Sequence, residues 1–116
     1  MTATVLRLYM HESRRHRGML LYDWLLEQGR RLGIHGGSAF RAVAGYGRHG
    51  VLHEQHFFEL AGELPVVTEF IVSDDEANSI LALLGKENID LVYARWHAEF
   101  SMTGSPGTAS RGGATG

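Results

Sequence analysis

The sequence changes twice from a strand pattern to a helical pattern, and this repeat constrains the fold more than any other feature. Apolar residues alternate over 4–11, and β-branched and aromatic residues dominate 65–72. Both patterns are typical of β-strands. Each is followed by a stretch with the apolar spacing of an amphipathic helix, over about 19–32 and from Ser73 to Gly85. The chain is therefore predicted to contain two strand–helix units.

Sequence signals mark the ends of both predicted helices. Gly33 is placed to end the first helix as a C-terminal cap. Ser73 and Glu76 have the spacing of a capping box at the start of the second helix, which Gly85 is expected to end. The predicted buried stripes consist of Leu21, Trp24, Leu25 and Leu32 in the first helix and Ala77, Ile80, Leu81 and Leu84 in the second.

Two further strands are expected, over about 38–44 and 90–100. The order is then strand, helix, strand, strand, helix, strand, which is the ferredoxin-like βαββαβ arrangement of the α+β class. Right-handed connections place both helices on one face of a four-stranded antiparallel sheet. We expect Trp24 and Trp96 to fill the single core between them.

The second face of this sheet is expected to be mixed in character. It would carry the following residues or their immediate neighbours: Arg7, Tyr9, Arg41, Arg95, His97 and Glu99. The side of the last strand that holds Tyr93, Arg95, His97 and Glu99 has two interpretations. It is a hydrogen-bonded interface between copies of the chain, or His97 and Glu99 perform acid–base chemistry. The interface is favoured, because the helices leave this face open.

Composition limits the class of protein. The 116 residues suffice for one small domain, assigned to 1–102. Residues 103–116 hold five of the 15 glycines and no large apolar side chain, which predicts a flexible tail. The formal charge of −2 gives no electrostatic argument for nucleic acid, and no apolar run is long enough to insert in a membrane.

The residue types also argue against several kinds of chemistry. The absence of cysteine excludes disulfides and thiol catalysis, and the first residues lack the pattern of a signal peptide, so a cytoplasmic protein is expected. The sequence has neither a G-x-S-x-G motif nor a glycine-framed carboxylate pair. It therefore favours a protein that is not an enzyme.

An arginine-rich segment directly before the first helix is the first candidate site. Arg14, Arg15 and Arg17, with His16 between them, could pair with a phosphate or carboxylate, and the helix N-terminus adds its own positive end. The alternative is an ordinary solvated loop.

A second candidate is the glycine-rich, basic loop after the strand at 38–44. Gly45 and Gly47 would let the backbone approach an anion closely, and Arg48 would supply charge. The alternative is a hinge for a mobile loop.

Three histidines in the spacing H-x3-H-x2-H offer a different function. On a helix, His49 and His53 would share a face with His56 beside them, and the set could bind a divalent metal such as zinc, nickel or copper. On a strand, His56 would point away from the other two. The segment is not convincingly helical, so a metal site is the alternative rather than the favoured interpretation.

Four segments, taken together, resemble a known family. They are residues 12–18 with Leu21 and Tyr22 (ESRRHRG and LY), 33–47 (GIHGGSAFRAVAGYG), 50–53 (GVLH) and 64–72 (LPVVTEFIV). In this order, over about residues 4–100, they resemble the family called domain of unknown function 190, which is PII-like.

The resemblance implies a regulatory or signalling protein that forms a homotrimer. It implies a small anionic effector, such as an adenine nucleotide, in clefts between subunits. The divalent metal, which the histidine spacing alone suggests, is the less favoured ligand. A loop at about 45–62 would contact a partner, which the resemblance suggests is a membrane transporter or channel. The chain departs from PII proteins after the second helix, where their phosphate-binding loop resembles T-G-x-x-G-D-G-K. Here residues 85–90 contain one glycine and one lysine.

Overall fold

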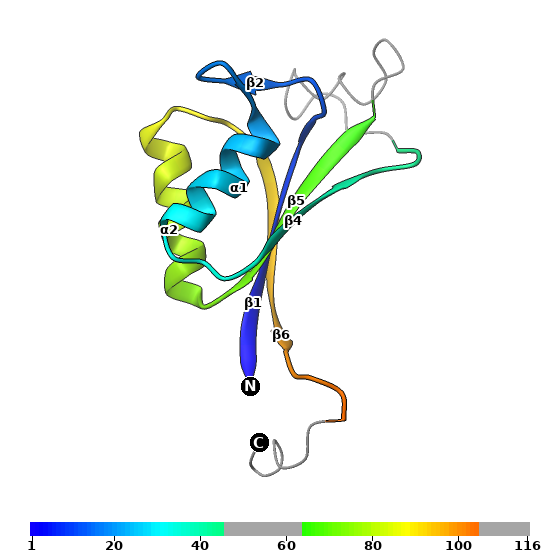
Figure 1. Ribbon diagram of the computed structural model, residues 1–116, viewed down its shortest axis with the longest axis vertical. Helices are drawn as coiled ribbons and strands as arrows, with labels where there is room; N and C mark the ends of the chain where they lie inside the picture. Colours follow the sequence, from blue (N-terminus) through cyan, green and yellow to red (C-terminus); the bar gives the residue numbers. More distant parts are fainter. Residues whose placement is uncertain (46–63, 105–116) are drawn as a thin grey trace.

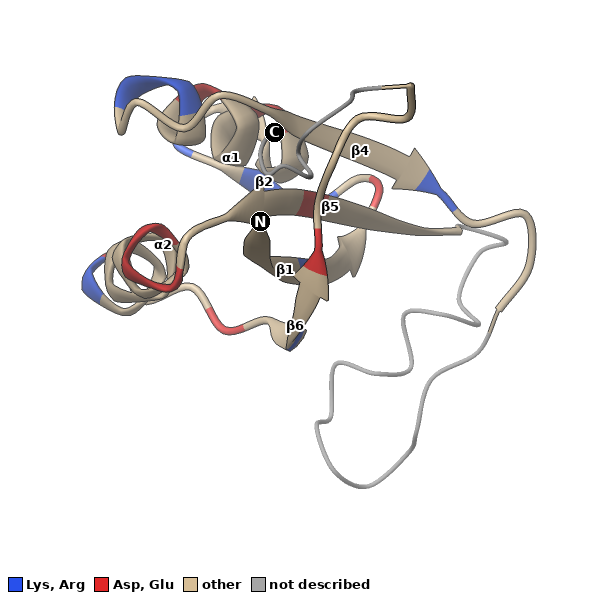
Figure 2. Cartoon of the chain, turned by 90° about the horizontal axis from the view of Figure 1, so that it is seen from below, with Lys and Arg blue, Asp and Glu red and all other residues tan. Residues whose placement is uncertain are grey.

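Four antiparallel strands form the main sheet of the computed structural model, which describes residues 1–45 and 64–104. The strands are β1 (Thr2–His11), β4 (Gly37–Arg41), β5 (Pro65–Val72) and β6 (Val92–Glu99), in the spatial order β4-β5-β1-β6. Helices α1 (Leu21–Arg31) and α2 (Asp74–Lys86) lie side by side along one face of the sheet (Figures 1 and 2). This confirms the predicted ferredoxin-like fold.

The core lies between the sheet and the two helices. Leu6 and Leu8 on β1 and Phe70 on β5 are almost fully buried there, together with Leu25 of α1 and Ile80 of α2. In an antiparallel sheet, alternate residues point to opposite faces. Leu6 is opposite Phe70 and Leu8 is opposite Thr68, so the register aligns the residues that face the helices.

Both helices end in a Schellman motif, and the second does so differently from the prediction. At the end of α1, Gly33 has φ +84°, and Ile34 N–H donates to the Gly29 carbonyl. At the end of α2, Asn88 has φ +58°, and Ile89 N–H donates to the Leu84 carbonyl. Gly85 therefore lies within the last turn of α2 and does not end it.

Of the two predicted helix starts, one is confirmed and the other is corrected. The capping box at Ser73 is present, with Ser73 Oγ accepting from Glu76 N–H and the Glu76 carboxylate accepting from Ser73 N–H. Helix α1 begins at Leu21 rather than near Met19, because Met19 belongs to a short strand. Leu32, predicted to be buried, caps this helix and is 46% exposed.

The face assignment of the last strand was wrong. Trp96 is opposite Val5, lies on the face away from the helices and is 43% exposed, whereas Trp24 is buried as expected. Arg95 and His97 instead project on the helix side, where both contact Asp74 of α2. The predicted tail at 103–116 lies almost entirely outside the described residues and stays a prediction.

Candidate functional site

The arginine-rich segment folds as a hairpin and not as a plain loop. Strands β2 (Arg15–His16) and β3 (Met19–Leu20) pair with each other between β1 and α1. The two residues of the turn, Arg17 and Gly18, have φ values of +52° and +81°. Positive φ at both central positions is the geometry of a type I′ hairpin turn. The segment thus acquires a defined shape with Arg17 at the first central position of the turn.

The hairpin packs against the connection between α2 and β6. Arg14 Nη1 donates to the Asp90 carbonyl at 2.8 Å, and Arg17 Nε donates to Glu87 Oε1 at 2.9 Å. His16 Nε2 lies 2.8 Å from the same Glu87 oxygen. Arg15 stays within the hairpin, where Nη2 donates to the Gly18 carbonyl at 2.9 Å. The three predicted arginines therefore already have partners within the chain.

Glu87 is the residue that the sequence did not single out. Its hydrogen bonds from Arg17, and then from His16, hold the pKa of its carboxyl below the ordinary value. The same contact raises the pKa of Arg17. One signal was present in the sequence: a carboxylate at the C-terminal end of a helix opposes the helix dipole, so it needs a cation nearby.

His16 is held between this carboxylate and the core. Its ring meets the ring of Trp24 edge to face, with centroids 4.6 Å apart and an interplanar angle of 72°. Its side chain is only 20% exposed. Because Trp24 is itself buried in the core, its contact holds the His16 imidazole in this orientation.

The second candidate segment leaves the sheet at the same end as the hairpin. His11, at the end of β1, pairs with Pro65, and Arg41, at the end of β4, forms an ion pair with Glu12 at 3.0 Å. Gly45 follows four residues later and lies beside Pro65. The structure thus brings the starts of both predicted anion segments to one end of the sheet. Gly47 and Arg48 lie outside the described residues.

The metal hypothesis is untested. His49, His53 and His56 all lie outside the described residues. Within residues 1–45 and 64–104, no group of three or more His, Asp or Glu side chains is arranged to hold a metal ion. A histidine-loop metal site stays a prediction.

A second polar cluster joins the start of α2 to the sheet. The Asp74 carboxylate accepts hydrogen bonds from Thr4 Oγ1, from Arg95 Nη2 at 3.0 Å and from the His97 ring at 3.1 Å. These contacts, that of Thr4 first, lower the pKa of Asp74 to about 2. His97 is therefore paired with Asp74 and not with Glu99, the carboxylate named beside it in the less favoured acid–base alternative.

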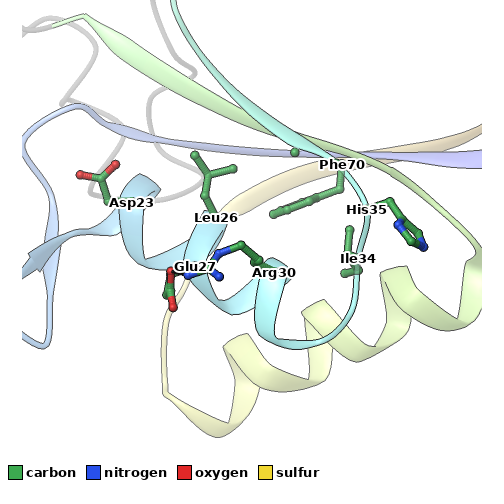
Figure 3. Close-up of a pocket in the computed structure, with 10 residues that line it drawn as sticks. Asp23, Leu26, Glu27, Arg30, Ile34, His35 and Phe70 are labelled. Atoms are coloured by element: carbon green, nitrogen blue, oxygen red, sulfur yellow. Dashed lines mark hydrogen bonds and ion pairs between the residues drawn. The ribbon is translucent and has the colours of Figure 1, made fainter.

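A cavity of about 380 Å³ opens between the C-terminal half of α1 and the start of β4. Figure 3 shows Asp23, Leu26, Glu27 and Arg30 along one side and the Phe70 ring on the floor. Glu27 is paired with Arg30 and with Arg31. The cavity therefore combines an apolar floor at Phe70 with a rim that carries charged side chains.

Comparisons with known proteins agree with this architecture. The crystal structure of a protein described as PII-like, from Thermus thermophilus, matches with a TM-score of 0.51 at 19% identity, over 84% of this chain and 85% of that one. The fold is therefore that of PII-like proteins.

Sequence comparisons identify the family. The family model of domain of unknown function 190 (DUF190), described as “Uncharacterized ACR”, matches residues 3–91. A UPF0166 protein of Aquifex aeolicus is 30% identical over 77% of this chain and 92% of that one. A UPF0166 protein of Methanocaldococcus jannaschii is 32% identical over 71% of this chain and 75% of that one. The chain belongs to the DUF190 family. No helix in the described part of the chain is long and apolar enough to cross a membrane.

Proposed function

We propose that this protein is a homotrimeric PII-like regulator that binds a small anionic effector between subunits and presents the segment at about 45–62 to a partner protein. The observation that carries the proposal is an apolar sheet face opposite the helices, which no element in the described part of the chain covers (Figure 1). We call it the open face.

Two apolar rows cross the open face. One runs through Ile71, Val5 and Trp96, and the other runs through Phe40, Val67, Tyr9 and Val92, as the strand register places them. Phe40, Ile71, Val92 and Trp96 are each between 41% and 52% exposed. Exposed apolar rows of this kind are unusual on a monomer and common where copies associate. The PII-like fold supports a trimer as the assembly that covers it.

The effector site is proposed around the hairpin. Arg14, Arg15 and Arg17 lie at the end of the sheet from which the segment following Gly45 departs. An anion bound there, such as the phosphate of an adenine nucleotide, would reach that segment and alter its fit to a partner. The effect requires that the effector bind the two states of the segment with different affinity. A transporter or channel is the partner that the family resemblance suggests.

The assembly is tested by light scattering on the purified protein and on Trp96→Glu. We expect a trimer for the wild type and a monomer for the variant, because a carboxylate in place of the apolar ring is costly to bury in an interface. Leu32→Glu is the matched control, since Leu32 is similarly exposed but does not lie on the open face. A wild-type monomer at micromolar concentration contradicts the proposal.

The effector is tested by calorimetric titration of the metal-free wild type with ATP, ADP, AMP and cyclic AMP, each with and without Mg²⁺. One nucleotide bound per subunit supports the proposal. A trimer that binds none of the four nucleotides leaves the assembly intact but contradicts an adenine nucleotide as the effector. A final titration with Zn²⁺ tests the histidine-loop alternative.

A further inference from the structure

The carboxylate of Glu87 lies against Arg17 and His16 of the hairpin. It accepts from Arg17 Nε at 2.9 Å and from Arg17 Nη2 at 3.3 Å, and it lies 2.8 Å from His16 Nε2. We propose that Glu87 is an internal occupant of an oxyanion site and that a phosphate group replaces it when an effector binds. This inference rests on the effector site proposed above.

The position of Glu87 favours this interpretation. Glu87 is the C-cap of α2, where the carbonyl ends of the helix disfavour a negative charge. Its side chain is nevertheless only 14% exposed. The attraction that holds it there therefore comes from the hairpin. The same donors, Arg17 and His16, would attract any other anion that reached them.

The donors fit a phosphate better than a carboxylate. Glu87 Oε1 is shared by His16 and the nearer Arg17 nitrogen, while Oε2 has one long hydrogen bond, at 3.3 Å. A phosphate group has three terminal oxygens and can give each donor its own acceptor. His16 takes part as a donor when the proton is on Nε2.

The site is open to exchange. The Arg17 side chain is 66% exposed, so a solute can reach its guanidinium. Water at the exposed Arg17 guanidinium screens its attraction for Glu87 and so weakens the ion pair. Arg14 holds the hairpin to the Asp90 carbonyl independently of Glu87. The hairpin can therefore keep its place when the carboxylate is displaced.

The test measures the binding of inorganic phosphate and of AMP to the wild type and to Glu87→Gln, by calorimetry at low salt. Removal of the internal charge should tighten phosphate binding about tenfold, as expected for the loss of a competing charged hydrogen bond. Glu27→Gln is the matched control: Glu27 is likewise paired with basic side chains, Arg30 and Arg31 of α1, and its loss should change nothing. An equal gain for phosphate and AMP identifies the phosphate group as the ligand, whereas a larger gain for AMP identifies a nucleotide.

A second variant, Glu87→Ala, and a measurement on the wild type keep the inference testable if Glu87→Gln does not fold. The alanine variant removes both the charge and the bulk and should bind phosphate at least as tightly as Glu87→Gln. In the wild type, saturating phosphate should shift the NMR signals of the His16 ring and the Glu87 side chain together. Folded variants that bind no tighter than the wild type overturn the inference. If neither variant folds, a wild-type spectrum unchanged at both residues overturns it.

These outcomes are separate from those of the proposed function. A monomeric wild type contradicts the trimeric regulator, yet a gain of phosphate binding in Glu87→Gln would still support the oxyanion site. A trimer that binds nucleotide, with no gain in the Glu87 variants, contradicts the exchange of Glu87 alone.

Discussion

At the scale of single residues, Gly29 shows how packing overrides helix propensity. Alanine would ordinarily favour a helix interior by about 1 kcal/mol over glycine. A Cβ at Gly29 would lie 2.7 Å from Phe70 Cε1, and one at Gly37 would lie 2.6 Å from the same atom. Phe70 is 2% exposed and cannot move aside freely. The two glycines therefore provide the space that this ring occupies.

Gly29→Ala should lower the free energy of unfolding, measured in urea, by about 1–3 kcal/mol, the usual range for overpacking a core. Gly85→Ala is the matched control. Gly85 lies in the last turn of α2, and a Cβ added there would meet no other atom within 4 Å, so the variant should be slightly more stable than the wild type. Equal stability of the two variants would mean that the Phe70 ring does not fill this space.

The contacts of Asp74 make the free energy of unfolding depend on pH in the acidic range. Its pKa is lowered in the folded chain from 3.8 to about 2, so its contribution is complete above pH 3.8 and is lost as the pH falls towards 2. Asp74→Asn should be less stable than the wild type at pH 7, and the difference should shrink between about pH 4 and 2. Urea unfolding across this range checks it. Asp75→Asn, in the same turn but outside the Thr4, Arg95 and His97 contacts, should not reproduce the convergence.

At the scale of elements, the sequence predicted a strand or a helix end correctly where one local signal determined it. Strand β5 has the predicted bounds of 65–72, because it is rich in residues that suit a buried pleat. The capping box at Ser73 was found because its hydrogen bonds are local. The β2–β3 hairpin was missed, since strands of two residues are too short to show a period. Arginine, moreover, is not a residue type that predicts a positive φ, so the conformation of Arg17 could not be foreseen.

The hairpin turn provides a test of that backbone. Arg17→Asn and Arg17→Val both remove the ion pair with Glu87, so their difference isolates the turn. Asparagine is favoured at positive φ before glycine, whereas a β-branched residue is strained there. The valine variant should be less stable than the asparagine variant by about 1–2 kcal/mol in urea unfolding. Indistinguishable variants would argue against the left-handed conformation of residue 17.

At the scale of the whole molecule, the error on β6 has a physical explanation. Alternation showed correctly which residues share a face, but hydrophobicity was then used to decide which face is covered. Here both faces of the sheet are apolar, because Val5, Trp96 and Ile71 line the open face while Leu6 and Phe70 face the helices. Hydrophobicity cannot distinguish the covered face of a sheet from the open face when both are apolar. The partner of Glu87 could not be predicted either, because the contact with Arg17 joins residues 70 positions apart.

The open face also contains one charged row between its apolar rows. Arg7 Nε donates to Glu69 Oε1 at 2.7 Å, and its guanidinium lies 5.5 Å from the centre of the Trp96 ring. The Arg7 and Glu69 side chains are 42% and 18% exposed. Association through this face would remove the remaining water from both. The pair would then act as a buried ion pair, in which the loss of one partner is worse than the loss of both.

Glu69→Gln should therefore weaken self-association by at least about tenfold, since it leaves the Arg7 charge uncompensated in the interface. The double variant Arg7→Met with Glu69→Met should associate more tightly than Glu69→Gln, because it leaves no unpaired charge. Sedimentation velocity over a range of protein concentrations measures both. Glu27→Gln serves as the control, because that carboxylate pairs with arginines on α1 and away from the open face. If both variants associate as tightly as the wild type, the copies do not meet through this row, and the assembly must use another surface.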